Sequence, residues 1–143
     1  MLKGLFRSET GAPIVEGHVA FPRLDRRGVV FFLVDTGADG TVLMPGDCDK
    51  LKIDYGTLVN PTTSQGIGGS SGGFTERAVL SFSDERFRYV YVLKIEISAP
   101  TRFNQEFPSL LGRDILNRGR SVIDFHRNQV TFAPRTWDLR RQV

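Results

Sequence analysis

The chain alternates between short hydrophobic stretches and turn-forming residues. The strongest stretch covers residues 29–34 and runs directly into the polar residues that follow it. Stretches of this length bounded by Gly, Pro, Asn or Asp are typical of β-strands. We predict strands at residues 14–20, 29–34, 41–44, 78–82, 87–92, 122–125 and 130–132, with turns that include residues 26–28, 45–46, 83–84 and 127–128.

Helical patterns are scarce in comparison. Residues 114–118 form the one clear helix candidate, opened by Gly112 and closed near Gly119. Residues 47–51 are consistent with the start of a helical turn. Many short strands separated by glycine and proline turns favour an all-β fold with one short helix, either closed or sandwiched.

The composition is that of an ordinary globular protein, with 40% hydrophobic and 24% charged residues in a chain of 143. This length suits one domain. We expect a single domain over residues 1–143, with a core at about 14–132 and a C-terminal tail at 133–143. The net charge of +3 comes largely from arginine, but the tail holds only a short arginine run. A solvated tail is therefore favoured over a nucleic-acid patch.

The sequence offers few residues that bind metals and no long apolar stretch. The chain has one cysteine, Cys48, and two histidines far apart in sequence, His18 and His126, so we expect no disulfide framework, no metal and no cofactor. No apolar stretch approaches the roughly 20 residues that cross a bilayer. Residues 1–10 are too short and too charged for a signal peptide. We expect a cytoplasmic protein without membrane or nucleic-acid partners, although the chain could be one domain of a larger protein.

The most informative feature is the junction between the hydrophobic stretch 29–34 and Asp35-Thr36-Gly37. Burying a carboxylate at the end of a strand costs several kcal/mol unless it is paired or hydrogen-bonded, so we interpret Asp35 as a residue kept for chemistry. Thr36 offers a hydroxyl for a local hydrogen bond, and Gly37 allows the backbone to approach a ligand closely. The pattern predicts a rigid, accessible carboxylate.

A second motif, Leu110-Leu111-Gly112-Arg113, precedes the candidate helix. Again a hydrophobic pair meets a glycine. The guanidinium of Arg113 is a rigid fork of five donors that suits a carboxylate, and its natural partner is Asp39, two residues beyond the Asp-Thr-Gly turn. The alternative is that Arg113 lies on the helix surface.

Residues 66–73 are rich in glycine and serine. They do not open a helix, so a phosphate-binding loop fits poorly. A flexible linker is one alternative. A mobile β-hairpin tip that can close over a ligand fits better, because strand-like sequence follows at residues 78–82.

Asp35-Thr36-Gly37-Ala38-Asp39, followed by Thr41-Val42-Leu43 and by the distant Leu-Leu-Gly-Arg motif, resembles the retropepsin-like aspartic proteases. The resemblance covers roughly residues 29–132. It implies a small closed β-barrel that works as a two-fold homodimer. Each subunit would supply one catalytic aspartate, and the glycine-rich hairpin would be the flap.

The resemblance also implies roles for individual residues. The catalytic loop would comprise Asp35, Thr36 and Gly37, and Asp39 would pair with Arg113 as structural support. Substrate would be bound by Leu33, Ala38, Asp39, Val42, Ile67, Gly68, Gly69 and Leu110. Asp35 and its symmetry mate would share one proton, as is established for aspartic proteases, so that one carboxylate activates water and the other donates to the oxyanion.

Two departures from the retroviral pattern affect substrate recognition. Gly40 stands where retroviral enzymes often have a second acidic residue, and residues 45–66 form a longer segment than in compact viral enzymes. The specificity pockets are therefore not implied by the resemblance.

Three functions fit the chain to different degrees. The leading one is a homodimeric aspartic endopeptidase that hydrolyses extended polypeptides. The second is a catalytically silent dimer that acts as a peptide-binding or interaction module, against which the intact Asp-Thr-Gly argues. The third, a basic nucleic-acid-binding β-domain, rests only on the arginine tail and on exposed aromatic residues such as Trp137.

Overall fold

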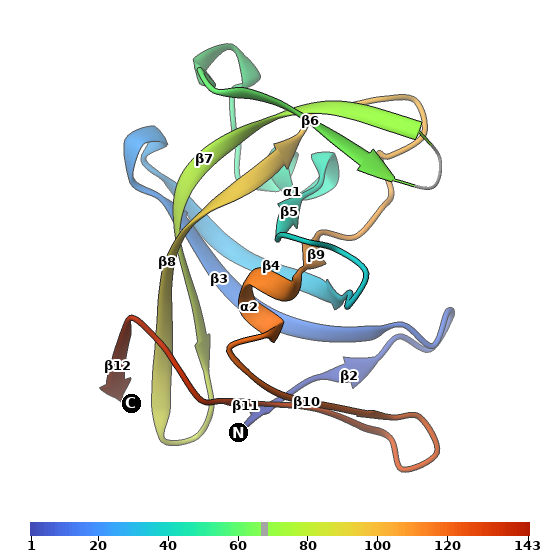
Figure 1. The fold of residues 1–143 in the computed structure, drawn as a ribbon, viewed down its shortest axis with the longest axis vertical. Coiled ribbons are helices and arrows are strands. Elements are labelled where there is room, and N and C mark those ends of the chain that lie inside the picture. The colour runs from blue at the N-terminus through green and yellow to red at the C-terminus, as the bar shows by residue number, and fades with distance from the viewer. Residues whose placement is uncertain (67–68) are drawn as a thin grey trace.

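The computed structural model describes the backbone of residues 1–66 and 69–143. Within these residues the chain forms twelve strands, two short α-helices and two 3-10 turns at Pro22–Leu24 and Tyr55–Thr57 (Figure 1). The helices are α1 (Pro45–Lys50) and α2 (Arg113–Leu116). The strands are β1 (Leu2–Lys3), β2 (Leu5–Phe6), β3 (Pro13–Phe21), β4 (Arg26–Val34), β5 (Val42–Leu43), β6 (Pro61–Gly66), β7 (Gly69–Ser83), β8 (Phe87–Ser98), β9 (Leu110–Leu111), β10 (Gly119–Asp124), β11 (Gln129–Pro134) and β12 (Leu139–Gln142).

Six strands close into a barrel in the order β8-β5-β9-β4-β3-β7, and the β7–β8 pairing completes the ring. The two-residue strands β5 and β9 fill the gap between the long strands. β5 runs parallel to β8, and β9 runs parallel to β4. The expected all-β closed barrel is therefore confirmed, and the sandwich alternative is not found.

Three single strands extend the barrel sheet, and a small second sheet lies beside it. β6 continues antiparallel from β7 as a hairpin, and β12 adds to the free edge of β8. β2 pairs with β3. A small separate sheet, ordered β1-β11-β10, lies beside α2 at one end of the molecule (Figure 1).

The barrel interior follows from alternation along the strands. Val30 and Phe32 of β4 are fully buried, whereas Val29 and Phe31, which alternate with them, are 50% and 45% exposed. Phe32 and Tyr91 each pack against Phe82, with ring centroids 6.3 Å apart in both pairs. Burying side chains of this kind contributes about 1.5–3 kcal/mol each, so this cluster is a main source of the barrel's stability.

The strand predictions are largely confirmed, with three corrections. Residues 26–28 are not a turn but the start of β4, because the reversal comes earlier, at Asp25, whose φ of 51° is left-handed. Residues 45–46, expected as a turn, are the start of α1, so the described chain has two short α-helices where the sequence predicted one. The residues expected as a tail include β12 and Trp137, which packs against Tyr89.

The end of β4 is open to solvent on one side. The outer face of β4 is solvated, and Asp35 at its end is half-buried in the single chain. Among the described residues, no helix combines the length and apolar character needed to cross a membrane.

Candidate active site

The loop that carries Asp35 is suspended between β4 and β9. Leu33 donates its N–H to the carbonyl of Ser109 at 2.8 Å, and Asp35 donates its N–H to the carbonyl of Leu111 at 3.1 Å. These bonds continue the parallel pairing of Leu33 with Leu110. The hydrophobic run of β4 therefore ends at a fixed point, and the carboxylate emerges from a rigid backbone.

The Asp-Thr-Gly residues form a tight turn. The backbone N–H of Gly37 donates to Oδ1 of Asp35 at 2.9 Å, and that of Ala38 donates to the carbonyl of Asp35 at 3.2 Å. The first bond holds Oδ1 of the carboxylate, and the second closes the backbone turn that carries it. Its other oxygen receives no hydrogen bond from the described residues.

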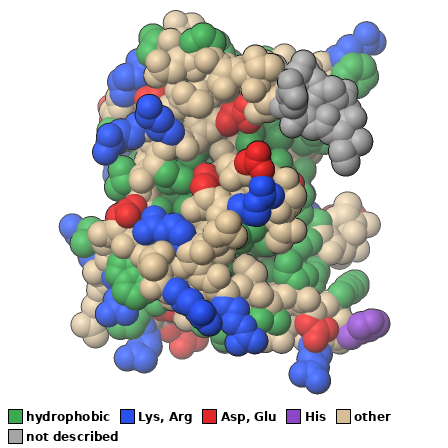
Figure 2. Space-filling view, in the orientation of Figure 1, with side chains coloured by type: hydrophobic (Ala, Val, Ile, Leu, Met, Phe, Trp, Pro, Cys, Tyr) green, Lys and Arg blue, Asp and Glu red, His purple; other side chains and the backbone are tan. Residues whose placement is uncertain are grey.

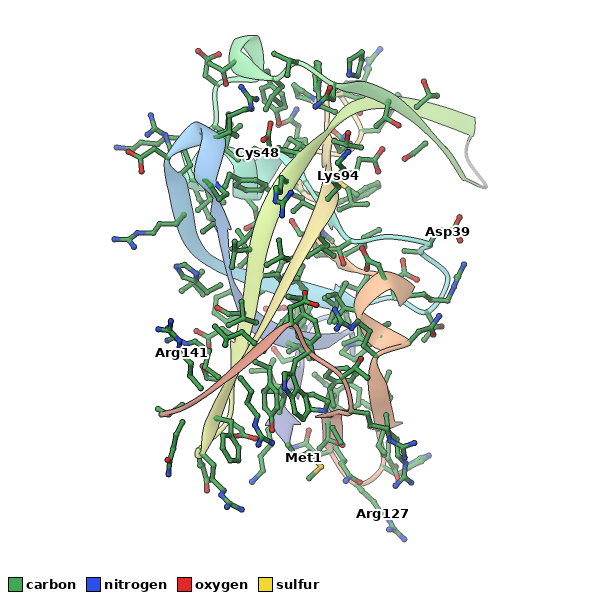
Figure 3. The ribbon with its side chains drawn as sticks, turned by 60° about the vertical axis from the view of Figure 1, so that its left-hand side comes forward. Met1, Asp39, Cys48, Lys94, Arg127 and Arg141 are labelled. Carbon is green, nitrogen blue, oxygen red and sulfur yellow. The ribbon has the colours of Figure 1, made fainter. Side chains whose placement is uncertain are left out.

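Arg113 braces the loop from the first turn of α2. Its Nη1 donates to the carbonyl of Thr36 at 2.8 Å, its Nη2 pairs with Oδ1 of Asp39, and its backbone N–H donates to the carbonyl of Ala38 at 2.9 Å. Asp39 itself lies at the outer end of the loop, with its side chain 95% exposed (Figure 3). An ion pair this exposed is worth at most about 1 kcal/mol, so its importance is geometric.

A second support was not predicted from the sequence. Asp114 accepts two hydrogen bonds from Thr41, one from the backbone N–H at 2.9 Å and one from the hydroxyl at 2.8 Å. The same hydroxyl accepts the N–H of Gly112 at 3.2 Å. A Cβ on Gly112 would lie 2.4 Å from the backbone of Gly40, so the two glycines let the loop and α2 meet. In the sequence, only the position of Asp114 in the first turn of α2 indicated that it could accept these hydrogen bonds.

The loop borders a large groove of about 1530 Å³. Of the residues expected at the site, Asp35, Gly37, Ala38, Asp39, Val42 and Leu110 line it. Leu33 and Thr36 do not: Leu33 is held in the sheet between Ile14 and Leu110, and Thr36 is exposed beside the groove. Ile67 and Gly68 lie outside the described residues, and Gly69 pairs with Gly66 at the start of β7.

Several groove residues come from segments whose role the sequence did not indicate. The hairpin strand β6 contributes Thr62, Thr63 and Ser64, and β8 contributes Lys94, Ile95, Glu96 and Ser98. The segment between β8 and β9 contributes Arg102, Phe103 and Phe107, whose two aromatic rings are 76% and 56% exposed. The groove is thus mixed, with an apolar floor near Asp35 and charged groups along β8.

No group of three or more His, Cys, Asp or Glu side chains in the part of the chain that the structure describes is arranged to hold a metal ion. On the face drawn in Figure 2, basic side chains are interspersed with acidic and uncharged ones.

The sequence matches no protein-family model and no curated protein. The structure, however, is similar to a crystal structure of a retropepsin-like aspartic protease from Rickettsia conorii, with a TM-score of 0.60 at 18% identity over 90% of this chain and 86% of that one. It is also similar to the EIAV protease in complex with the inhibitor HBY-793, with a TM-score of 0.55 at 21% identity over 79% of this chain and 92% of that one.

These similarities define a class. The chain has a retropepsin-like fold, as the motifs around Asp35 and Arg113 predicted. The identities are low, so the likeness concerns the fold alone, and the chemistry has to be argued from the site.

Proposed function

We propose that this chain is an aspartic endopeptidase that acts as a two-fold homodimer. The observation that carries the proposal is the Asp35 carboxylate, which is held by Gly37 at the end of β4 and faces a long groove on a retropepsin-like fold. The Arg113 bonds to Thr36 and Asp39 support it, because they hold the loop in one conformation.

The proposed chemistry needs two carboxylates. Two aspartates brought about 3 Å apart cannot both ionise, so they share a proton, as in known aspartic proteases. The ionised Asp35 removes a proton from a water molecule, which attacks the scissile carbonyl carbon. The protonated Asp35 of the other subunit donates to the developing oxyanion, and the C–N bond then breaks as the leaving nitrogen takes up a proton.

A homodimer is proposed because the chain has one Asp-Thr-Gly, and a two-fold axis would place two copies face to face. The loop after β4 and the turn between β10 and β11 project to the same side of the molecule (Figure 1). On that side β10 pairs only with β11 among the described strands, and Ile123 on it is 45% exposed. An unpaired edge with an exposed apolar residue suits contact with a second copy.

The groove suits an extended peptide. It runs between the loop of Asp35, the hairpin strand β6 and strand β8, and apolar Val42 and Leu110 form part of its lining. Peptides that bind as an added strand use main-chain hydrogen bonds for affinity and pockets for alternate side chains for specificity.

The test is the substitution Asp35→Asn, which keeps the shape of the side chain and removes its acid–base function. We expect hydrolysis of a diverse peptide library, read by mass spectrometry, to fall by at least about a thousandfold, since the catalytic carboxylate acts both as general base and as general acid. Asp25→Asn is the matched control. Asp25 is exposed, does not line the groove and has a left-handed backbone conformation that asparagine also adopts. The Asp25→Asn protein should therefore be as active as the wild type.

Cleavage that survives in the Asp35→Asn protein would refute the assignment. Peptide binding without cleavage by the wild type, under all conditions from pH 4 to 7, would instead identify the silent binding module.

A further inference from the structure

The groove contains a second acidic side chain that the proposed chemistry does not use. Glu96 lies on β8, where it is paired in register with Val42 of β5, and its backbone N–H donates to the carbonyl of Thr41 at 3.1 Å. Its side chain is half-buried and lines the groove that Asp35 also lines. A carboxylate is thus held inside the groove on a rigid strand.

Glu96 has a hydrogen-bond donor but no ionic partner in the described part of the chain. The hydroxyl of Ser64, from the hairpin strand β6, donates to its Oε1. None of the ion pairs formed among the described residues includes Glu96, although Lys94 and Arg102 also line the groove. By contrast Asp39, which also lines the groove, is paired with Arg113.

The surroundings of Glu96 strengthen any interaction with a cation. Val42, its register partner on β5, also lines the groove, and a bound peptide would displace water from it. Charges interact several times more strongly at the effective dielectric of a partly buried site than in bulk water. A half-buried carboxylate without a counter-ion is itself unfavourable, so a substrate that supplies the opposite charge is favoured.

We infer that Glu96 forms a subsite for a positively charged side chain, lysine or arginine, of the bound peptide. This inference rests on the proposed function of the groove. Ser64 orients the carboxylate through Oε1, and Oε2 is left for the incoming ammonium or guanidinium group. Gly40 lines the groove without a side chain. Of the acidic residues that line it, Asp35 has the proposed catalytic role and Asp39 is paired with Arg113, so Glu96 is the one that can receive a cation.

The position of the subsite along the peptide follows from the sheet. Glu96, Val42, Leu110 and Leu33 are successive partners across β8, β5, β9 and β4. Three strand spacings separate Glu96 from the strand that ends at Asp35, or roughly 14 Å between backbones. An extended peptide advances about 3.3 Å per residue, so the cationic residue should lie within about four positions of the cleaved bond.

The experiment measures binding in the Asp35→Asn background, so that no peptide is cut. Octapeptides carry either lysine or norleucine, which has the same carbon chain without the charge, at one position at a time. We expect lysine to lower Kd at least tenfold at one position within four residues of the centre and its symmetry equivalent, with the advantage shrinking in 1 M salt. Glu96→Gln keeps the side-chain oxygen that accepts Ser64 and should remove the preference. Glu96→Lys should reverse the preference, so that a peptide with glutamate at that position binds more tightly than one with lysine.

Glu16→Gln is the matched control, because Glu16 is an exposed residue of β3 that does not line the groove. It should keep the full preference for lysine. Equal binding of the two peptide series, absence of binding by both, or a lysine preference that persists in Glu96→Gln overturns the inference. If Glu96→Gln fails to fold, a salt-independent Kd of the lysine peptides overturns it.

The two proposals fail separately. Wild-type cleavage without a cation preference leaves the endopeptidase and removes the subsite. Tight, Glu96-dependent binding of lysine peptides without any cleavage by the wild type keeps the subsite and removes the endopeptidase.

Discussion

Gly112 shows how closely two segments approach at the site. Its missing side chain lets the backbone of Gly40 lie where a Cβ would be, 2.4 Å away, and neither backbone can retreat without breaking the bonds among Thr41, Asp114 and Gly112. The requirement for glycine here is one of space, since its φ is ordinary for any residue.

Gly112→Ala should therefore destabilise the protein by about 2 kcal/mol or more, as overpacking against rigid backbone does. Gly72→Ala is the control, because a Cβ there meets nothing within 4 Å. Its free energy of unfolding in urea should stay within about 0.5 kcal/mol of the wild type. Equal stability of the two variants would contradict the close contact.

Cys48 is the one cysteine, and it lies fully buried on α1 (Figure 3). Burial raises the pKa of its thiol to about 11. Because the folded protein disfavours the thiolate, this effect stabilises the fold fully below about pH 9 and is lost as the pH rises toward 11.

At pH 8 the native thiol should react with a disulfide reagent such as DTNB at least about a hundredfold more slowly than in the urea-unfolded chain, as a pKa raised by about two units implies. Absorbance of the released thiolate measures both rates. Rapid stoichiometric reaction of the native protein would show that Cys48 is accessible.

Residues could be predicted from the sequence where their immediate neighbours in the chain indicate their role. Asp35 stands directly after a hydrophobic stretch, and Arg113 directly after a glycine. Asp114 and Glu96 could not be predicted, because each acts through a partner on a segment far away in the chain, Thr41 for one and Ser64 for the other.

Among the elements, the C-terminal segment differs most from expectation. Trp137 packs against Tyr89 with ring centroids 5.3 Å apart, and the guanidinium of Arg140 lies over the rings of both Phe87 and Trp137 at 4.3 and 4.7 Å. Asp138 accepts the N–H of Val92 at 2.7 Å, and this bond, helped by Arg118, lowers the pKa of Asp138. The segment is thus attached to β8 by side chains as well as by β12.

Trp137→Ala should release this attachment. We expect trypsin to cleave after Arg140 or Arg141 at least about fivefold faster, because the local opening energy falls while the barrel core is untouched. Val143→Ala, at an exposed position beyond β12, is the control. Unchanged cleavage in Trp137→Ala would mean that backbone pairing alone holds the strand.

The physical reason for the missed elements is that their strands carry little hydrophobic alternation. All four residues of β12 are exposed, so no buried apolar position marks this strand in the sequence, and its order comes from pairing with β8 and from contacts such as those of Arg140. The second half of β8 interrupts its apolar positions with Lys94 and Glu96, and the prediction therefore stopped at residue 92. Short β9 was read as a motif because two residues make no pattern.

At the scale of the whole molecule, the proposed dimer predicts that substitutions on the edge strand β10 disrupt assembly. Ile123→Lys places a charge on the free edge of β10, where lysine is well tolerated in a monomer but unfavourable in a buried contact. We expect the mutant to sediment as a monomer at concentrations where the wild type is a dimer, and its activity per chain to fall at least about tenfold.

Val59→Lys makes the same change at a residue that is 62% exposed and lies before β6, outside the small sheet. It should leave sedimentation unchanged. A dimeric and active Ile123→Lys protein would place the interface elsewhere.

The order in which the chain is synthesised gives the closed ring a further consequence. β9 is the last of the six strands to leave the ribosome, and it supplies the carbonyl of Leu111 that holds the backbone of Asp35. Pairings between such distant segments form slowly, because a long loop must close before any bond compensates for it. A nascent chain therefore carries Asp35 long before it carries the strand that holds the Asp35 backbone in place, so the geometry of this loop is completed only after residue 111 has been made.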